Sequence, residues 1–215
     1  MGAGTLPNPV EMGLGNNSFW NGPIHLEGIT SVTAGGSPSV ASLNGPITGP
    51  GELIKDGSAP LLLGGNEPNT MAHGIDVAQG ELILAKPSGV AATGGSIIIG
   101  QPQAGMVPAR LTLNASHQIP DELNVFVLKT GTFAMNSGAE AVHVIDGRGT
   151  IQIGGGSLTT SFDANVSDIE FDGTLNGTAG SVFSKAGTGR LNMTAVGDFA
   201  GKVQIAGGEI ALNGS

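Results

Sequence analysis

The last segment of the chain is punctuated by glycine, and this pattern limits the possible folds more than any other feature. In residues 187–215, GTGRLNMTAVGDFAGKVQIAGGEIALNGS, glycines recur every few residues between the short runs RLNM, KVQI and EIAL. Such runs alternate apolar and polar residues, which is the period of a strand with one buried face. Similar runs bounded by Gly, Asn, Pro or Asp occur along the whole chain, whereas helical periodicity is almost absent. The sequence therefore predicts an all-β protein.

An internal repeat relates residues 53–84 to residues 183–212. The offset is 130 residues in the first half and two fewer after a shorter loop. The matched pairs are Leu53 with Phe183, Lys55 with Lys185, Gly57 with Gly187, Leu61 with Leu191, Leu63 with Met193, Val77 with Ile205, Gly80 with Gly208, Glu81 with Glu209, Leu82 with Ile210 and Leu84 with Leu212.

Strands of four to six residues are too short to bury their apolar side chains alone, so recurring strands favour a solenoid in which successive coils stack. Glycine then occupies sharp corners and places where two coils approach closely. With roughly 20–25 residues per coil, the chain makes about nine or ten coils. We expect one β-helix segment over residues 1–215, with repeat copies at about 45–84 and 183–212 and a spacer at about 85–182.

The first copy resembles the autotransporter-associated β-strand repeat. The resemblance rests on a series of glycines and alternating residues followed by a Gly-Gly-x-Leu-x-Leu-like strand: Gly49, Gly51, Leu53, Lys55, Gly57, Leu61, Leu63, Asn66 and the strand from Gly80 to Leu84. The resemblance implies a right-handed parallel β-helix within the exported passenger of a much longer bacterial surface protein. The family is known as an architecture, and no reaction is attached to it.

Composition narrows the possible partners. Eight Lys and Arg stand against 17 Asp and Glu, and the formal net charge is −9. Such a chain repels nucleic acid and anionic membranes, so neither is expected as a partner. The absence of cysteine excludes disulfides, zinc fingers and cysteine nucleophiles. No run reaches the roughly 18 apolar residues of a membrane-spanning helix, so this segment is not expected to insert into a membrane.

One acidic row is a candidate site. In SDIEFDG, Asp168, Glu170 and Asp172 alternate with Ile169 and Phe171, so on a strand the three carboxylates share one face. The first interpretation is a solvated outer face on an acidic protein. The alternatives are a calcium site, because Ca²⁺ takes oxygen ligands, or the acid and base of a glycosidase or lyase. No other cofactor is expected.

Two functions of different classes remain. The first is a non-enzymatic structural or adhesive segment of an autotransporter-like passenger, outside the cell or on the surface of a bacterium, with self-association or contact to a surface or glycan. The second is a polysaccharide lyase or glycoside hydrolase, because β-helices also host such enzymes. The scattered basic residues and the absence of tyrosine favour the first function.

Overall fold

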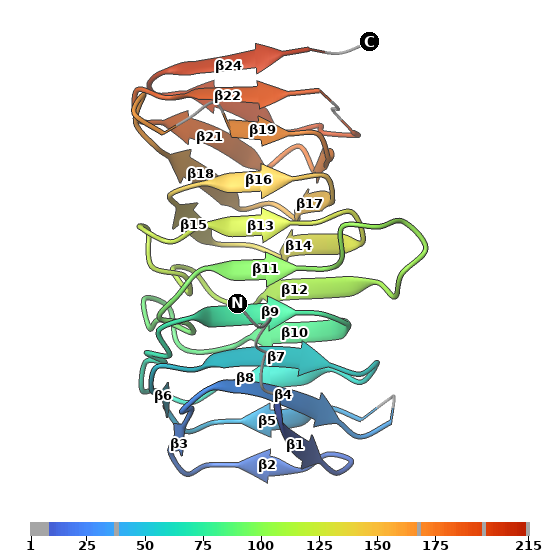
Figure 1. Cartoon of the computed structure of the whole chain (residues 1–215). Helices are drawn as coiled ribbons and strands as arrows, with labels where there is room; N and C mark the ends of the chain where they lie inside the picture. The colour runs from blue at the N-terminus through green and yellow to red at the C-terminus, as the bar shows by residue number, and fades with distance from the viewer. Residues whose placement is uncertain (1–8, 37–38, 167–168, 195–196, 214–215) are drawn as a thin grey trace, which may run out of the picture.

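The computed structural model describes residues 9–36, 39–166, 169–194 and 197–213, and Asp168 lies outside these ranges. The chain coils into a parallel β-helix of about nine turns, which confirms the expected fold class (Figure 1). Every strand pairing in the described ranges is parallel, and these ranges contain no helix. Accordingly, no described segment is a helix long and apolar enough to cross a membrane.

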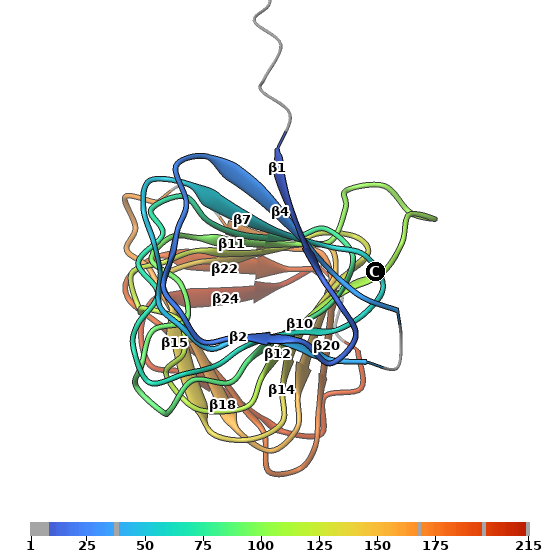
Figure 2. The same cartoon turned by 90° about the horizontal axis from the view of Figure 1, so that it is seen from below.

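The strands form three sides around a common interior (Figure 2). The first side is a ten-stranded sheet with the order β1 (Val10–Leu14), β4 (Ile29–Ala34), β7 (Glu52–Asp56), β9 (Gly74–Val77), β11 (Ile97–Ile99), β13 (Val125–Val127), β16 (Ile145–Gly147), β19 (Ile169–Phe171), β22 (Arg190–Met193) and β24 (Glu209–Leu212). The second side is an eight-stranded sheet with the order β2 (Phe19–Trp20), β5 (Ala41–Leu43), β8 (Leu61–Leu63), β10 (Gly80–Leu84), β12 (Ala109–Leu113), β14 (Gly131–Met135), β17 (Thr150–Ile153) and β20 (Thr174–Gly177). The third side carries a pair, β3 (Ile24–His25) and β6 (Ile47–Thr48), and a four-stranded sheet, β15 (Ala139–Val142), β18 (Ser157–Ser161), β21 (Val182–Ala186) and β23 (Lys202–Ile205).

Side chains at matching positions of successive coils stack directly over one another. On the second side, one inward column is continuous through six strands, and each member is at most 1% exposed: Leu61, Leu82, Leu111, Phe133, Ile151 and Leu175. Burying a side chain of this size contributes about 1.5–3 kcal/mol. The alternation of short apolar runs therefore produces the core, because each coil supplies one layer to every column.

The third side is interrupted between β6 and β15, and polar side chains replace the missing strand contacts. The Ile47 N–H donates to Asn69 Oδ1 at 2.9 Å, and Asn69 Nδ2 donates to the Ala92 carbonyl at 2.9 Å. Further along, the Gln118 and Ile119 N–H groups donate to the two carboxylate oxygens of Glu140 at 2.8 and 3.4 Å. Asn69, Gln118 and Glu140 are at most 1% exposed, so these bonds are internal to the protein.

Three lysines are buried at corners of the coil, and each directs its ammonium group to backbone carbonyls. Lys55 Nζ donates to the carbonyls of Asp56, Gly57 and Gln79 at 2.8, 2.6 and 3.0 Å. Lys86 Nζ donates to Gly64 and Glu67, and Lys185 Nζ to Phe162, Ala186 and Gly187. All three lysines are at most 1% exposed. Each lysine therefore supplies hydrogen-bond donors to backbone carbonyls at its corner of the coil.

The structure corrects one predicted strand. The alternation of apolar and polar residues in AVHVID, residues 141–146, predicts a single strand, but β15 ends at Val142 and β16 begins at Ile145. The chain turns from the third side to the first at His143 and Val144. Val144 is nevertheless 4% exposed, so the apolar alternation continues through the corner and hides the bend from pattern analysis.

Two glycines with the same backbone angle test the role of close approach between coils. Gly74 and Gly89 both have φ of +82°, but a Cβ on Gly74 would lie 2.0 Å from the Ser96 carbonyl oxygen, whereas a Cβ on Gly89 would meet nothing within 4 Å. Gly89→Ala is expected to cost about 1 kcal/mol for the left-handed backbone alone. Gly74→Ala is expected to cost about 3 kcal/mol, because the next coil must also shift. Urea unfolding of both variants measures the difference, and equal losses would contradict this account.

Candidate functional site

Glu170 on β19 and Asp172 directly after it, the two described members of the acidic row, lie on the outer face of the first side. Glu170 is exposed, whereas Ile169 and Phe171 are 8% and 1% exposed, so the predicted alternation of this strand is confirmed for the described residues. The Asp172 side chain is 23% exposed, lies beside Arg148 with Nε–Oδ2 at 3.5 Å, and accepts a hydrogen bond from the Thr194 hydroxyl. Asp168 lies outside the described residues, so the structure places two of the three carboxylates.

A third carboxylate that the sequence did not single out joins this cluster. Gly147 of β16 pairs with Phe171 of β19, which puts Asp146 beside Glu170 on the outer face. Burial raises the pKa of Asp146; the Gly147 N–H and the charge of Arg148 oppose this, and the charge of Asp172 adds to it. Asp146, Gly147, Arg148, Glu170 and Asp172 line a depression of about 260 Å³.

This cluster is partly neutralised by its own arginine. Within the described residues, no three His, Cys, Asp or Glu side chains are arranged to hold a metal ion. The ion pair between Arg148 and Asp172 already engages one of the carboxylates. Calcium binding by Asp168, Glu170 and Asp172 together stays a prediction, because the first of the three is not described.

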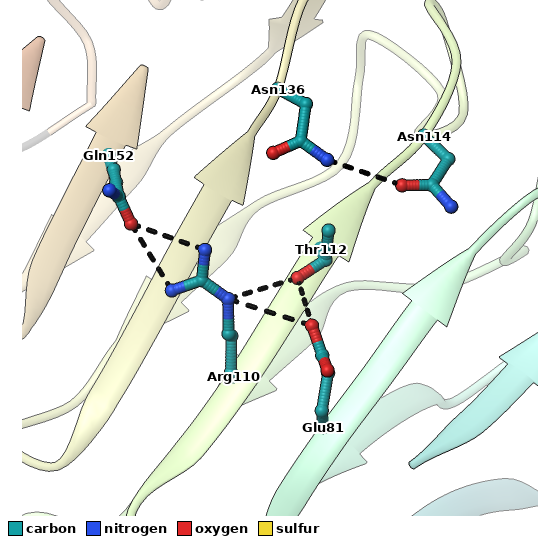
Figure 3. Close-up of polar contacts among 6 residues, drawn as sticks. All are labelled: Glu81, Arg110, Thr112, Asn114, Asn136 and Gln152. Carbon is teal, nitrogen blue, oxygen red and sulfur yellow. Dashed lines mark hydrogen bonds and ion pairs between the residues drawn. The ribbon is translucent and has the colours of Figure 1, made fainter. Parts of the chain in front are cut away.

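A second polar cluster covers the outer face of the eight-stranded sheet and was missed by the sequence analysis (Figure 3). Arg110 lies between Glu81 and Gln152: its Nε is 3.6 Å from Glu81 Oε1, and both terminal nitrogens donate to Gln152 Oε1 at 3.2 Å. The Thr112 hydroxyl accepts from Arg110 Nε at 3.1 Å and donates to Glu81 at 2.6 Å. Arg110 and Gln152 are 42 residues apart, so only the register of β12, β14 and β17 brings them together.

A protruding loop separates these two clusters. Residues 101–108 join β11 on the first side to β12 on the second and extend beyond the neighbouring corners (Figures 1 and 2). Thr130 anchors the base of the loop: its Oγ1 accepts from the Gln101 N–H at 2.9 Å, its N–H donates to the Gln101 carbonyl at 3.2 Å, and its carbonyl accepts from the Ala109 N–H at 3.2 Å. Met106 and Val107 are 51% and 49% exposed near the end of the loop.

A depression of about 270 Å³ lies against the base of this loop. It is lined by Pro102, Leu128, Lys129, Gly147 and Arg148. Gly147 and Arg148 also line the acidic depression, so the two hollows are adjacent. The corner between the first and second sides therefore combines an extended loop, two apolar side chains and a mixed set of charges. Sequence analysis missed this surface. The coil that carries the loop is longer than the one before it: paired residues Ile97 and Val125 are 28 positions apart, whereas Ile75 and Ile97 are 22 positions apart.

Comparison with known proteins finds a relative among bacterial adhesins. The chain is 31% identical over 186 residues to the adhesin BmaC autotransporter of Brucella suis biovar 1 (strain 1330), an alignment that covers 85% of this chain. The chain spans 4% of the length of that relative. No protein-family model matches the chain, and no solved structure matches it. The similarity to an autotransporter adhesin and the stacked parallel coils together identify the chain as an autotransporter passenger-like β-solenoid repeat protein.

Proposed function

We propose that this chain is a non-enzymatic, adhesive segment of a bacterial surface passenger. The observation that carries the proposal is the similarity to an adhesin across 85% of the chain. The fold supports it, because a stack of coils presents long outer faces without requiring a catalytic centre. The protruding 101–108 loop adds an irregular surface of the kind that often carries binding.

Adhesion is tested by displaying residues 1–215 on a non-adherent bacterium and counting cells attached to a host-cell layer. The control is the same display scaffold without the chain. We expect attachment above the control, reduced by added soluble chain in proportion to its concentration. Attachment equal to that of the empty scaffold would contradict the adhesive role.

The enzymatic alternative has a direct test. Purified chain is incubated with polyuronates and neutral glycans, and new reducing ends or unsaturated products are measured. We expect no turnover above that of the triple variant Asp146→Ala, Glu170→Ala and Asp172→Ala. Turnover that disappears in this variant would establish a carboxylate-dependent enzyme and end the non-enzymatic interpretation.

Self-association is the finer part of the proposal, and it concerns residues 1–215 taken as a segment on their own, whose first and last coils expose apolar side chains. At one end Val203, Ile205 and Leu212 are 48%, 57% and 66% exposed, although Val203 and Leu212 occupy inward positions in register with the buried Phe183 and Met193. At the other end Phe19 and Trp20 are 68% and 49% exposed. In this 215-residue segment taken on its own, head-to-tail contact between the first and last coils would give open filaments rather than closed dimers.

We expect the average mass of the chain, measured by light scattering after size exclusion, to rise with concentration. Val203→Lys is expected to reduce this rise, because a charge in the interior column opposes stacking of a further coil. Lys202→Gln is the matched control on the same strand, since Lys202 is exposed and pairs only with the Gln204 side chain within the described residues. A constant monomer mass across the accessible concentrations would contradict self-association.

A further inference from the structure

We propose that the depression at the base of the 101–108 loop binds a carboxylate-bearing sugar of a glycan. The inference rests on the adhesive function proposed above and names the chemistry of its ligand. The site is lined by the cations of Lys129 and Arg148 and by the apolar side chains of Pro102 and Leu128.

The distribution of positive charge supports an acidic ligand. Of the eight lysines and arginines, Lys55, Lys86 and Lys185 are at most 1% exposed and are bonded to carbonyls, so they cannot meet a partner. Two of the remaining five, Lys129 and Arg148, line this one depression. Lys129 and Arg148 place two cations at one hollow of a chain with net charge −9, although Arg148 also balances the carboxylates of the adjacent acidic depression.

Both cations have donors available to a ligand. The Arg148 side chain is 70% exposed, and its ion pair with Asp172 uses Nε. In the described ranges, neither the terminal nitrogens of Arg148 nor Lys129 Nζ has a hydrogen-bond or ion-pair partner. Val127 pairs with Gly147, which sets Leu128 beside Arg148 on neighbouring coils. A planar carboxylate matches the fork of the guanidinium, and the nearby ammonium adds a second positive charge.

The size and shape of the hollow favour a single sugar. Its volume of about 270 Å³ is below the range of about 300–1,000 Å³ typical of pockets for drug-sized ligands. Pro102 and Leu128 offer apolar surface to the C–H face of a ring, while Lys129 and Arg148 can meet its acidic group. Thr130 fixes the base of the loop through three backbone or hydroxyl hydrogen bonds, so this wall is held in place before a ligand arrives.

Peptide binding by strand addition is not open to this region. β13 pairs with β11 and β16, and β12 pairs with β10 and β14, so the strands around the hollow have no free edge. A partner must instead use the side chains of the corner. Charge and volume then favour an acidic sugar over an extended acidic peptide.

The test is titration calorimetry of the 215-residue chain with sialyllactose and with trigalacturonate, against lactose and the methyl ester of trigalacturonate. We expect both acidic ligands to bind at about millimolar affinity, as befits a shallow site, and both neutral ligands to bind at least tenfold more weakly. Arg148→Gln and Lys129→Gln are each expected to lower the affinity for the acidic ligands about tenfold. Lys202→Gln, a distant exposed lysine, is expected to leave it unchanged. Thermal melting checks that the variants fold.

Equal binding of sialyllactose and lactose would overturn the site, as would equal losses in Lys129→Gln and Lys202→Gln. Tighter binding of penta-aspartate than of either acidic sugar would overturn it in favour of an acidic peptide. The display assay separates this inference from the adhesive function. Attachment that is unaffected by Lys129→Gln and Arg148→Gln contradicts the sugar site and leaves adhesion intact, whereas sugar binding without any attachment supports the site and contradicts adhesion.

Discussion

Replacing Glu140 with alanine is expected to lower the free energy of unfolding by about 3–5 kcal/mol, because two backbone N–H groups of the preceding coil then lose their acceptor inside the protein. The carboxylate accepts from Gln118 and Ile119, and the whole residue is 1% exposed. Gln118 and Ile119 belong to no strand in the described ranges, so the side chain of Glu140 takes the place of a strand partner for their N–H groups. Urea unfolding at pH 5 and pH 8 gives the loss under both conditions.

The same residue makes stability depend on pH. Burial raises the pKa of Glu140 from 4.5 to about 7, although the N–H groups of Gln118, Ile119 and Ala141 oppose the shift. Between these two values the folded protein holds a proton that the unfolded chain has released, so stability falls as the pH rises through this window. Burial, together with the charges of Glu52 and Asp56, raises the pKa of Asp76 to about 6 and acts in the same direction. The wild-type chain is therefore expected to lose roughly 2 kcal/mol between pH 5 and pH 8 through Glu140 alone.

Glu140→Gln is the matched variant for this effect. It keeps the size of the side chain and one acceptor oxygen but cannot titrate, so we expect a loss of about 1–2 kcal/mol at pH 5 and a flatter profile from pH 5 to pH 8. A profile as steep as that of the wild type would show that other groups cause the pH dependence.

Replacing Lys55 with alanine is expected to cost about 3–4 kcal/mol. The substitution leaves a cavity where a fully buried side chain stood and removes the donor shared by the carbonyls of Asp56, Gly57 and Gln79. Burial lowers the pKa of this lysine to about 8, partly offset by the charge of Asp56, so at pH 7 the ammonium form still prevails.

Lys55→Met separates packing from hydrogen bonding. Methionine fills most of the volume but donates nothing, so the expected loss is about 1–2 kcal/mol. Thermal or urea unfolding of Lys55→Ala, Lys55→Met and the exposed control Lys202→Ala gives the comparison. If Lys55→Ala and the control lost equal stability, the buried ammonium would have no structural role.

The burial of Glu140 and Lys55 could be predicted in part from their positions in the sequence. Lys55 is two residues from Leu53, and Glu140 is two residues before Val142, so each shares the inward parity of a core residue. A charged residue at an inward position predicts an internal partner. The backbone groups that act as these partners could not be predicted. Only the register between coils places Gln79 beside Lys55 and Gln118 beside Glu140.

The strands and their stacking could be predicted from the sequence because each coil repeats the same alternation of apolar and polar residues. The third side could not be predicted in this way. Asn69 and Gln118 support it through hydrogen bonds but belong to no described strand, and no sequence periodicity marks such segments. The surface around Lys129 and Arg148 was also hidden, because the two residues meet only through the pairing of β13 with β16. Sequence therefore predicted the scaffold better than the surface it presents.

The two copies of the repeat lie on different sides of the coil. The first copy runs from β7 to β10 across the ten-stranded and eight-stranded sheets, whereas the second runs from β21 to β24 across the third side and the ten-stranded sheet. Lys55 and Lys185 nevertheless form the same carbonyl-bonded corner. The motif therefore specifies a corner of the coil rather than one of its three sides. A gene duplication inserted one-third of a winding out of phase would still continue the rod, which gives proteins of this architecture unusual freedom to lengthen by recombination.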